Sequence, residues 1–121
     1  MYELMVKGTF SAAHSLRNYS GKCEHLHGHN YIVEIYIESA KVNKNGLAVD
    51  FVVLKSKLKK ILNILDHKYL NKDCKYFRKN NPSAENIAKY IFDLLKKKIK
   101  EAELKKICVY ESENAKACYF E

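Results

Sequence analysis

The chain has 121 residues, of which 47% are hydrophobic, so it suits one folded domain and excludes a disordered polypeptide. No apolar run reaches the ~18 residues that a membrane-spanning helix needs. Residues 1–10 mix charged and apolar side chains, unlike a signal peptide, so we expect a cytoplasmic protein without membrane contact.

The formal net charge of +8 permits two kinds of partner, nucleic acid and a phosphorylated small molecule. The excess is nearly all lysine, and the solvated faces of two predicted helices account for most of it. Only two arginines occur, fewer than a protein that reads nucleic-acid grooves is expected to use. We therefore expect no nucleic-acid partner, and a basic binding module with a structural zinc is the competing hypothesis.

The first half of the chain predicts two strands. Residues 2–14 alternate between apolar and polar side chains, and residues 29–37 alternate in the same way. The polar residues 15–26 between them are typical of a loop. This pattern indicates an antiparallel pair with one buried face. The Asn45-Gly46 pair then predicts a turn.

The second half predicts two amphipathic helices and two more strands. Asp50 and Ser83 are the expected N-caps of the helices, and a loop that ends at Pro82 separates them. Residues 104–111 and 115–120 form the closing strands. The order ββααββ predicts a single α+β domain over residues 1–121, with a four-stranded antiparallel sheet and two helices on one face. Its open face and edges favour a homo-oligomer.

Three histidines form a candidate metal site. His27 and His29 are two residues apart in an extended segment, so their rings point the same way. His14 ends the first strand on its apolar face, close to that pair if the two strands form a hairpin. Catalytic zinc typically takes three protein ligands and leaves a fourth position open. The alternative is three unrelated histidines near a loop.

Cys23 lies four residues before His27 and allows two interpretations. It could close the zinc site as a fourth ligand, or it could act as a thiolate beside the metal, with its pKa lowered by the positive charge. No C-x-x-C pair occurs among the four cysteines, and we expect all of them to be free thiols.

Two acidic positions complete the candidate chemistry. Asp66 precedes His67, and such an acid can orient the imidazole for proton transfer; alternatively His67 only complements the end of a helix. Glu111 falls on the apolar face of the third long strand, where a carboxylate needs a partner. It could accept two N–H groups from a flat heterocycle, or it could be the solvent end of the strand.

At this point the chain resembles the 6-pyruvoyltetrahydropterin synthase and 6-carboxytetrahydropterin synthase family, in which the bacterial 6-carboxytetrahydropterin synthases are the nearest group. Six matching segments occur in the family's order, which is far more specific than any one motif. They are residues 10–14 (FSAAH), 23–29 (CEHLHGH), 49–51 (VDF), 65–71 (LDHKYLN), 81–86 (NPSAEN) and Glu111.

The resemblance implies the tunnelling fold, in which ββααββ subunits assemble around a pore, usually as hexamers made of two trimers. It implies a zinc-dependent lyase acting on 7,8-dihydroneopterin triphosphate, a polyanion that suits the +8 charge. The family's site residues map onto this chain as zinc ligands His14, His27 and His29, catalytic base Cys23, proton relay Asp66 and His67, and pterin anchor Glu111.

The resemblance also bears on the product. A cysteine four residues before H-G-H, here Cys23, is typical of members that make 6-carboxytetrahydropterin for queuosine-type deazapurines. A glutamate three residues before it, here Glu24, is linked to 6-hydroxymethyl-7,8-dihydropterin of the folate pathway; alternatively Glu24 is an exposed loop acid. Both residues occur, so dual activity is possible, and 6-pyruvoyltetrahydropterin is a further alternative. Ser83 replaces a frequent threonine, keeps its hydroxyl, and is a candidate substrate contact.

Overall fold

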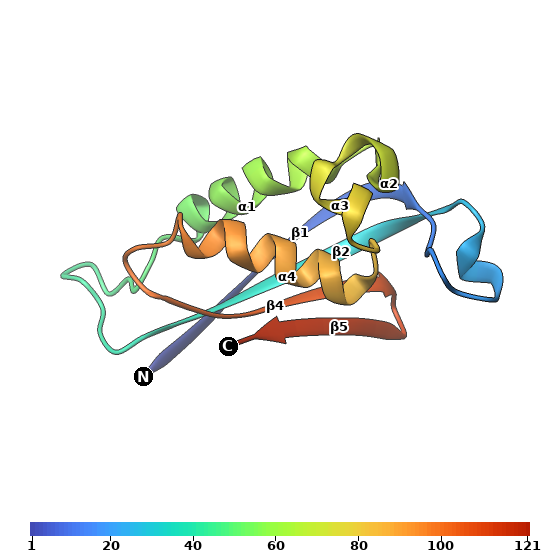
Figure 1. Cartoon of the computed structure of the whole chain (residues 1–121). Coiled ribbons are helices and arrows are strands. Elements are labelled where there is room, and N and C mark those ends of the chain that lie inside the picture. Colours follow the sequence, from blue (N-terminus) through green and yellow to red (C-terminus); the bar gives the residue numbers. More distant parts are fainter.

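A five-stranded sheet in the order β3-β1-β2-β4-β5 forms one layer of the protein, and helices form the other (Figure 1). The computed structural model describes all 121 residues. The strands are β1 Tyr2–His14, β2 His27–Ser39, β3 Lys68–Tyr69, β4 Glu103–Ser112 and β5 Ala115–Phe120. The helices are η1 Lys22–Glu24 (a 3-10 turn), α1 Phe51–Leu65, α2 Leu70–Asp73, α3 Lys75–Lys79 and α4 Ala84–Lys96.

Strands β1 and β2 pair over their whole length, from Tyr2 opposite Ser39 to His14 opposite His27. The predicted alternation is confirmed, because Phe10 and Tyr31 lie on the buried face and their rings stack at 4.6 Å. Fixed register matters here, since a slip by one residue would turn every side chain to the other face. The pairing therefore brings the ends of the two strands, with their histidines, together.

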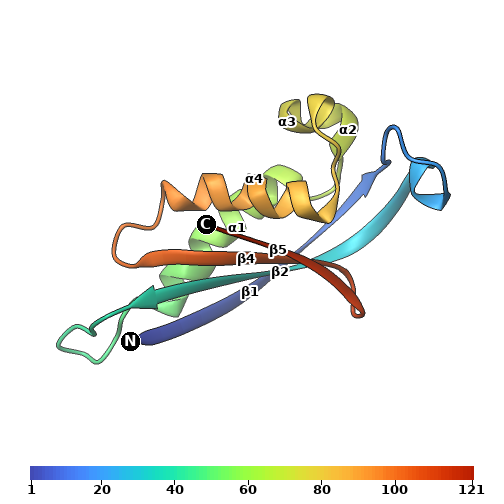
Figure 2. The same cartoon turned by 60° about the horizontal axis from the view of Figure 1, so that its bottom comes forward.

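Both long helices begin where the sequence predicts. Asp50 accepts a hydrogen bond from the backbone N–H of Val52 at 2.8 Å, and Ser83 Oγ accepts one from Asn86 at 3.2 Å. Each cap satisfies a backbone donor that the first helical turn leaves free. Figures 1 and 2 show α1 and α4 on the same face of the sheet, where their apolar stripes and the buried strand face form the core.

Two expectations about the central region are wrong. The sheet has five strands rather than four, because Lys68–Tyr69 pairs parallel with Ala12 and Ala13, which also makes the sheet mixed. The segment before Pro82 is not a plain loop but contains α2 and α3. A two-residue strand and helices of four and five residues are too short to show a hydrophobic period. Phe77 of α3 is fully buried, so packing against the core holds this segment.

The open face of the sheet carries a buried carboxylate. Glu34 lies between the core residues Val33 and Ile35 and so points to the face without helices, yet it is only 6% exposed. The hydroxyls of Tyr36 and Tyr110 donate to it at 3.0 and 3.2 Å, and Lys7 Nζ lies 3.7 Å away. These contacts replace the water that the carboxylate loses on burial.

The expectation of four free thiols is wrong for two of them. Cys108 and Cys118 form a disulfide between β4 and β5, while Cys23 and Cys74 are free. The antiparallel register places Cys108 directly opposite Cys118. Neither a C-x-x-C motif nor any other local spacing signals such a cross-strand pair, because it depends on how the two strands align.

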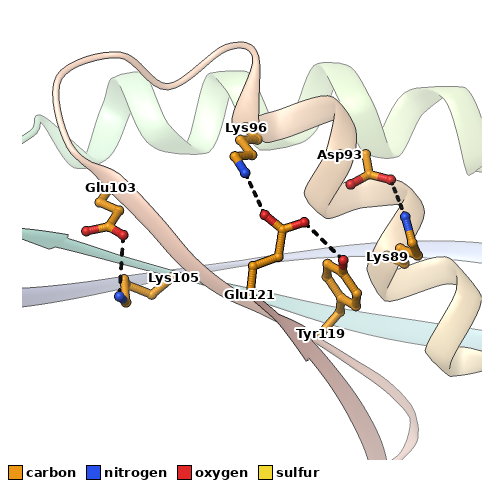
Figure 3. Close-up of polar contacts among 7 residues, drawn as sticks. All are labelled: Lys89, Asp93, Lys96, Glu103, Lys105, Tyr119 and Glu121. Atoms are coloured by element: carbon orange, nitrogen blue, oxygen red, sulfur yellow. Dashed lines mark hydrogen bonds and ion pairs between the residues drawn. The ribbon is translucent and has the colours of Figure 1, made fainter.

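The C-terminal residues hold β5 beneath α4. Lys96 pairs with one carboxylate oxygen of Glu121, and the hydroxyl of Tyr119 donates to the other at 3.1 Å (Figure 3). The last strand is thus tied to the helix layer at the end of the sheet far from the histidines.

No helix is both long enough and apolar enough to cross a membrane.

Candidate metal centre

Three imidazoles meet at one end of the sheet. His14 ends β1, and its register partner His27 begins β2, with His29 two residues further along the same face. Nε2 of His14 lies 3.0 Å from Nε2 of His27, and one ligand nitrogen from each of the three rings lies within 4.8 Å of the others. The predicted convergence of His14, His27 and His29 is confirmed, and the group has the size of a metal site.

Hydrogen bonds on the far side of two rings orient them toward the common point. Nδ1 of His14 donates to the carbonyl oxygen of Pro82 at 2.6 Å, and Nδ1 of His27 donates to that of His25 at 2.7 Å. A proton held on Nδ1 leaves the lone pair of Nε2 free for a metal ion, the arrangement that protein ligands typically show. The backbone thus fixes the tautomer that coordination needs.

The third ring leaves a polar atom without a partner. Nε2 of His29 is inaccessible to water and makes no hydrogen bond. Burial lowers the pKa of His29 and of the almost fully buried His14, so both imidazoles stay neutral near pH 7. An unpaired buried nitrogen is costly, and a bound cation would satisfy it. These donors therefore fit a divalent ion that prefers imidazole nitrogen, such as zinc.

Glu111 and Tyr31 border the triad. Glu111 is the extra residue where the β4–β5 register shifts between Tyr110 and Ser112, and its Oε2 lies 3.6 Å from Nε2 of His29. The strand turns this carboxylate toward the histidines, so Glu111 faces His29 across a gap longer than a hydrogen bond. The hydroxyl of Tyr31 lies 3.2 Å from Nδ1 of His14. Burial raises the pKa of Tyr31, which keeps this hydroxyl protonated.

Cys23 lies in η1, in the connection between β1 and β2, and is half-buried. Its carbonyl accepts a hydrogen bond from the N–H of Leu16 at 2.8 Å. The thiol is not among the ligand atoms that converge. The next residue, Glu24, is exposed and lies 3.9 Å from the ring of His25.

Asp66 and His67 form a side-chain pair away from the triad. They lie at the end of α1, on the edge of β1 opposite to β2. Asp66 accepts from the N–H of Ser11 at 2.9 Å and lies 3.0 Å from Nδ1 of His67. These two contacts lower the pKa of Asp66, the Ser11 N–H most strongly. The expected orientation of the imidazole by the acid is present.

The backbone of His67 takes an unusual conformation. Its φ is 58°, in the left-handed region that residues other than glycine rarely adopt. The N–H of His67 donates to the carbonyl of Ser11 at 2.6 Å, which holds this geometry. His67 and His29 line the same open hollow of about 520 Å³, reaching it from opposite sides of β1. A ligand in that hollow would meet one residue of the pair, His67, and one of the triad, His29.

Sequence reasoning missed the groups that support the ligands. Tyr31 and the carbonyls of Pro82 and His25 carry no motif of their own, because their role depends on contacts across the fold. Asn71 ends one matched segment and Asn81 begins another, and each makes a pair of hydrogen bonds to the backbone after β1. Their place in these segments was a signal, but no role followed from it. Ser83 appears here as a helix cap.

Comparison with known proteins agrees with this geometry. A sequence profile described as 6-pyruvoyl tetrahydropterin synthase matches residues 3–121. The chain is 37% identical over 109 residues to 6-pyruvoyl tetrahydrobiopterin synthase of Drosophila melanogaster, covering 79% of this chain and 65% of that protein. It is 36% identical over 97 residues to 6-carboxy-5,6,7,8-tetrahydropterin synthase of Synechocystis, covering 76% and 73%. The structure of the Caenorhabditis elegans 6-pyruvoyl tetrahydropterin synthase superposes with a TM-score of 0.90 at 28% identity, covering 99% and 95%.

Proposed function

Because the chain belongs to the 6-pyruvoyl tetrahydropterin synthase family, we propose that it is a zinc-dependent lyase acting on 7,8-dihydroneopterin triphosphate. The products are 6-carboxy-5,6,7,8-tetrahydropterin, acetaldehyde and triphosphate, which places the reaction in the supply of queuosine-type deazapurines. Relatives carry both carboxytetrahydropterin and pyruvoyl tetrahydrobiopterin names. The family therefore establishes a pterin-pathway synthase, and this chain's own residues support the choice of product.

The observation that carries the proposal is the convergence of His14, His27 and His29, with the Nε2 lone pairs of His14 and His27 left free for a metal ion. Three imidazoles and no fourth protein ligand match the pattern of catalytic zinc, which keeps one position for water or substrate. Cys23 supplies no converging atom, and this supports its assignment as a base rather than a ligand. When bound, zinc supplies Lewis-acid polarisation of the substrate's side-chain hydroxyls.

The chain's own groups then divide the remaining work. Glu111, beside His29, accepts two N–H groups of the pterin ring and so aims the substrate side chain at the triad. The Cys23 thiolate removes a proton from the acidified side chain. His67, oriented by Asp66, takes up and returns protons as the side chain tautomerises. Triphosphate leaves, and a water molecule adds to the carbonyl carbon next to the pterin ring. Cleavage of the neighbouring carbon–carbon bond then leaves a carboxyl group on the ring and releases acetaldehyde.

Glu24 supports a second candidate reaction. It is exposed, next to Cys23 in the same turn, and engaged only with the ring of His25 at 3.9 Å. A carboxylate free to swing toward the substrate could act as an alternative base and yield 6-hydroxymethyl-7,8-dihydropterin. Ser83 is proposed as a substrate contact, although its hydroxyl also caps α4.

A homo-oligomer, as a hexamer of two trimers, is part of the proposal. The β1 strand before Ala12 and the outer side of β5 have no neighbouring strand, and one sheet face carries no helix. Such edges are expected to be covered in a stable protein. Light scattering should give a mass about six times the 14.1 kDa of one chain.

The deciding experiment is product analysis. The zinc-loaded protein is incubated with 7,8-dihydroneopterin triphosphate, and acetaldehyde and pterins are identified by mass spectrometry. We expect 6-carboxytetrahydropterin and acetaldehyde in equal amounts. No turnover by fully zinc-loaded protein would refute the proposal, and 6-pyruvoyltetrahydropterin as main product would correct it.

Two variants separate the candidate bases. Cys23→Ala should abolish the carboxylated product while zinc content stays unchanged. Residual 6-hydroxymethyl-7,8-dihydropterin in Cys23→Ala that disappears in Cys23→Ala/Glu24→Ala would establish Glu24 as a second base. An unchanged product pattern in Glu24→Ala would make it a loop acid. Glu113→Ala, an exposed acid in the β4–β5 turn, is the matched control.

A further inference from the structure

Four consecutive residues, starting with the last residue of β1, make hydrogen bonds to three other segments of the fold. His14 donates to Pro82, as described. The peptide groups of Ser15 are bound by Asn71: Oδ1 accepts from the N–H at 2.9 Å, and Nδ2 donates to the carbonyl at 2.8 Å. Asn81 binds Arg17 in the same way, at 2.9 and 2.8 Å. Two side-chain amides thus bind the backbone as a neighbouring β-strand would. We call these two pairs of hydrogen bonds, from Asn71 to Ser15 and from Asn81 to Arg17, the clamps.

The opposite edge of this segment holds Cys23. The N–H of Leu16, between the two clamped residues, donates to the Cys23 carbonyl at 2.8 Å. Elsewhere in residues 18–26 the hydrogen bonds are local, namely Glu24 to Gly21, His25 to Lys22, and His25 to the ring of His27. The Leu16 contact is therefore what ties the turn bearing Cys23 to the body of the protein.

The two asparagines are themselves well anchored. Asn71 lies in α2, directly after the strand β3 that pairs with β1. The carbonyl of Asn81 accepts from Nδ2 of Asn86 in α4 at 2.9 Å. Asn81 also precedes Pro82, whose carbonyl orients His14. The clamps thus connect the Cys23 turn to the same backbone that orients a metal ligand.

We propose that Asn71 and Asn81 are positioning residues that hold the Cys23 thiol at its working place beside the histidines. This inference rests on the proposed function in taking Cys23 as the base. Without the clamps the Leu16 peptide loses its fixed position, and the Cys23 turn moves relative to the triad. The metal ligands keep their own support, because His27 and His29 belong to the paired length of β2.

The experiment compares Asn71→Ala, Asn81→Ala and the double variant with wild type. The first readout is the alkylation rate of Cys23 by iodoacetamide, measured by peptide mass spectrometry on zinc-loaded protein without substrate. The thiol is half-buried, so its alkylation should be severalfold faster in each variant and fastest in the double variant. Asn71→Asp, which keeps the acceptor for Ser15 and loses the donor, should be intermediate.

The second readout is kinetic. A misplaced base affects the chemical step, so kcat on 7,8-dihydroneopterin triphosphate should fall by up to about 10²-fold. KM and zinc content should stay at wild-type values. Asn80→Ala is the matched control and should change neither readout, because Asn80 only donates to Tyr76 in its own helical turn at 2.9 Å.

Wild-type alkylation rates and kcat in both single variants would overturn the inference. Loss of zinc in step with kcat would also overturn it, since the asparagines would then support the metal ligands. The single variants carry the test if the double variant does not fold. If wild type shows no turnover, the proposed function fails, but the alkylation rates still decide whether the clamps hold Cys23.

Discussion

Nε2 of His14 and Nε2 of His27 lie 3.0 Å apart, and backbone carbonyls hold the proton of each ring on Nδ1. Two lone pairs that face each other at this distance repel unless a cation lies between them. The residues are thirteen positions apart in sequence, and the β1–β2 register sets their separation. We therefore expect a metal ion bound between these two rings to stabilise the protein.

Metal removal should therefore destabilise the protein. At free zinc one hundred times the dissociation constant, binding contributes about 2.7 kcal/mol to the free energy of unfolding. A chelator should lower the melting temperature of wild type and leave that of His29→Ala unchanged. His25→Ala is the control and should keep zinc, because the exposed ring is lost but the carbonyl that accepts from His27 is retained. Equal melting curves with and without chelator in wild type would speak against a metal site.

Glu111→Gln should weaken substrate binding with zinc retained. An amide can accept one of the two pterin N–H groups but presents a donor to the other. Loss of a charge-assisted hydrogen bond costs about 2 kcal/mol, or roughly 30-fold in affinity. We expect this as a rise in KM. Glu113→Gln, exposed in the turn of the same hairpin, should leave KM unchanged. A fall in zinc content instead would make Glu111 a support of His29.

Asp66 should make stability depend on acid pH. Its pKa lies below the ordinary 3.8, so its contribution is present above 3.8 and is lost as pH falls through the lower folded value. The melting temperature of zinc-free wild type should therefore drop more steeply below pH 3.8 than that of Asp66→Asn. Asp66→Asn should also reduce kcat, because His67 loses its orienting partner. If the melting temperatures of wild type and Asp66→Asn fell equally with pH, the assigned contact with Ser11 would be contradicted.

The disulfide can be tested by counting thiols. Of the four cysteines, two should react with a thiol reagent in denatured, unreduced protein, and all four after reduction. The bridge closes a loop of ten residues between β4 and β5, so Cys108→Ala/Cys118→Ala should lower the free energy of unfolding by about 2–3 kcal/mol. Four reactive thiols in protein purified without reductant would show that the pair is reduced.

Ser83 offers a test of its two assigned roles. As the N-cap of α4 its loss in Ser83→Ala should cost about 1 kcal/mol of stability, as should Asp50→Ala at α1. Asp50 lies at the start of α1, away from the histidines, and serves as the matched control. If Ser83 also contacts substrate, only Ser83→Ala should raise KM. An unchanged KM would leave Ser83 as a cap alone.

Sequence patterns predicted the elements that are stabilised by interactions between residues close together in the chain. The alternation over residues 2–14 and the caps Asp50 and Ser83 are confirmed, because a strand's side-chain period and a cap's hydrogen bond involve near neighbours. The short strand β3 and helices α2 and α3 escaped prediction, since their stability comes from contacts such as the burial of Phe77. The Cys108–Cys118 bridge escaped because strand alignment alone creates it.

By itself the sequence determined the family segments and the candidate ligand set: the period of two puts His27 and His29 on one face, and His14 closes the apolar face of β1. Only the tertiary structure decided which nitrogen His14 presents, since the orienting carbonyl of Pro82 is 68 residues away. It also decided that Asp66 and His67 lie across β1 from the triad, and that Asn71 and Asn81 bind the backbone on either side of Leu16, whose N–H donates to the Cys23 carbonyl. Hydrogen bonds between distant segments leave no period in a sequence, so folding alone brings such partners together.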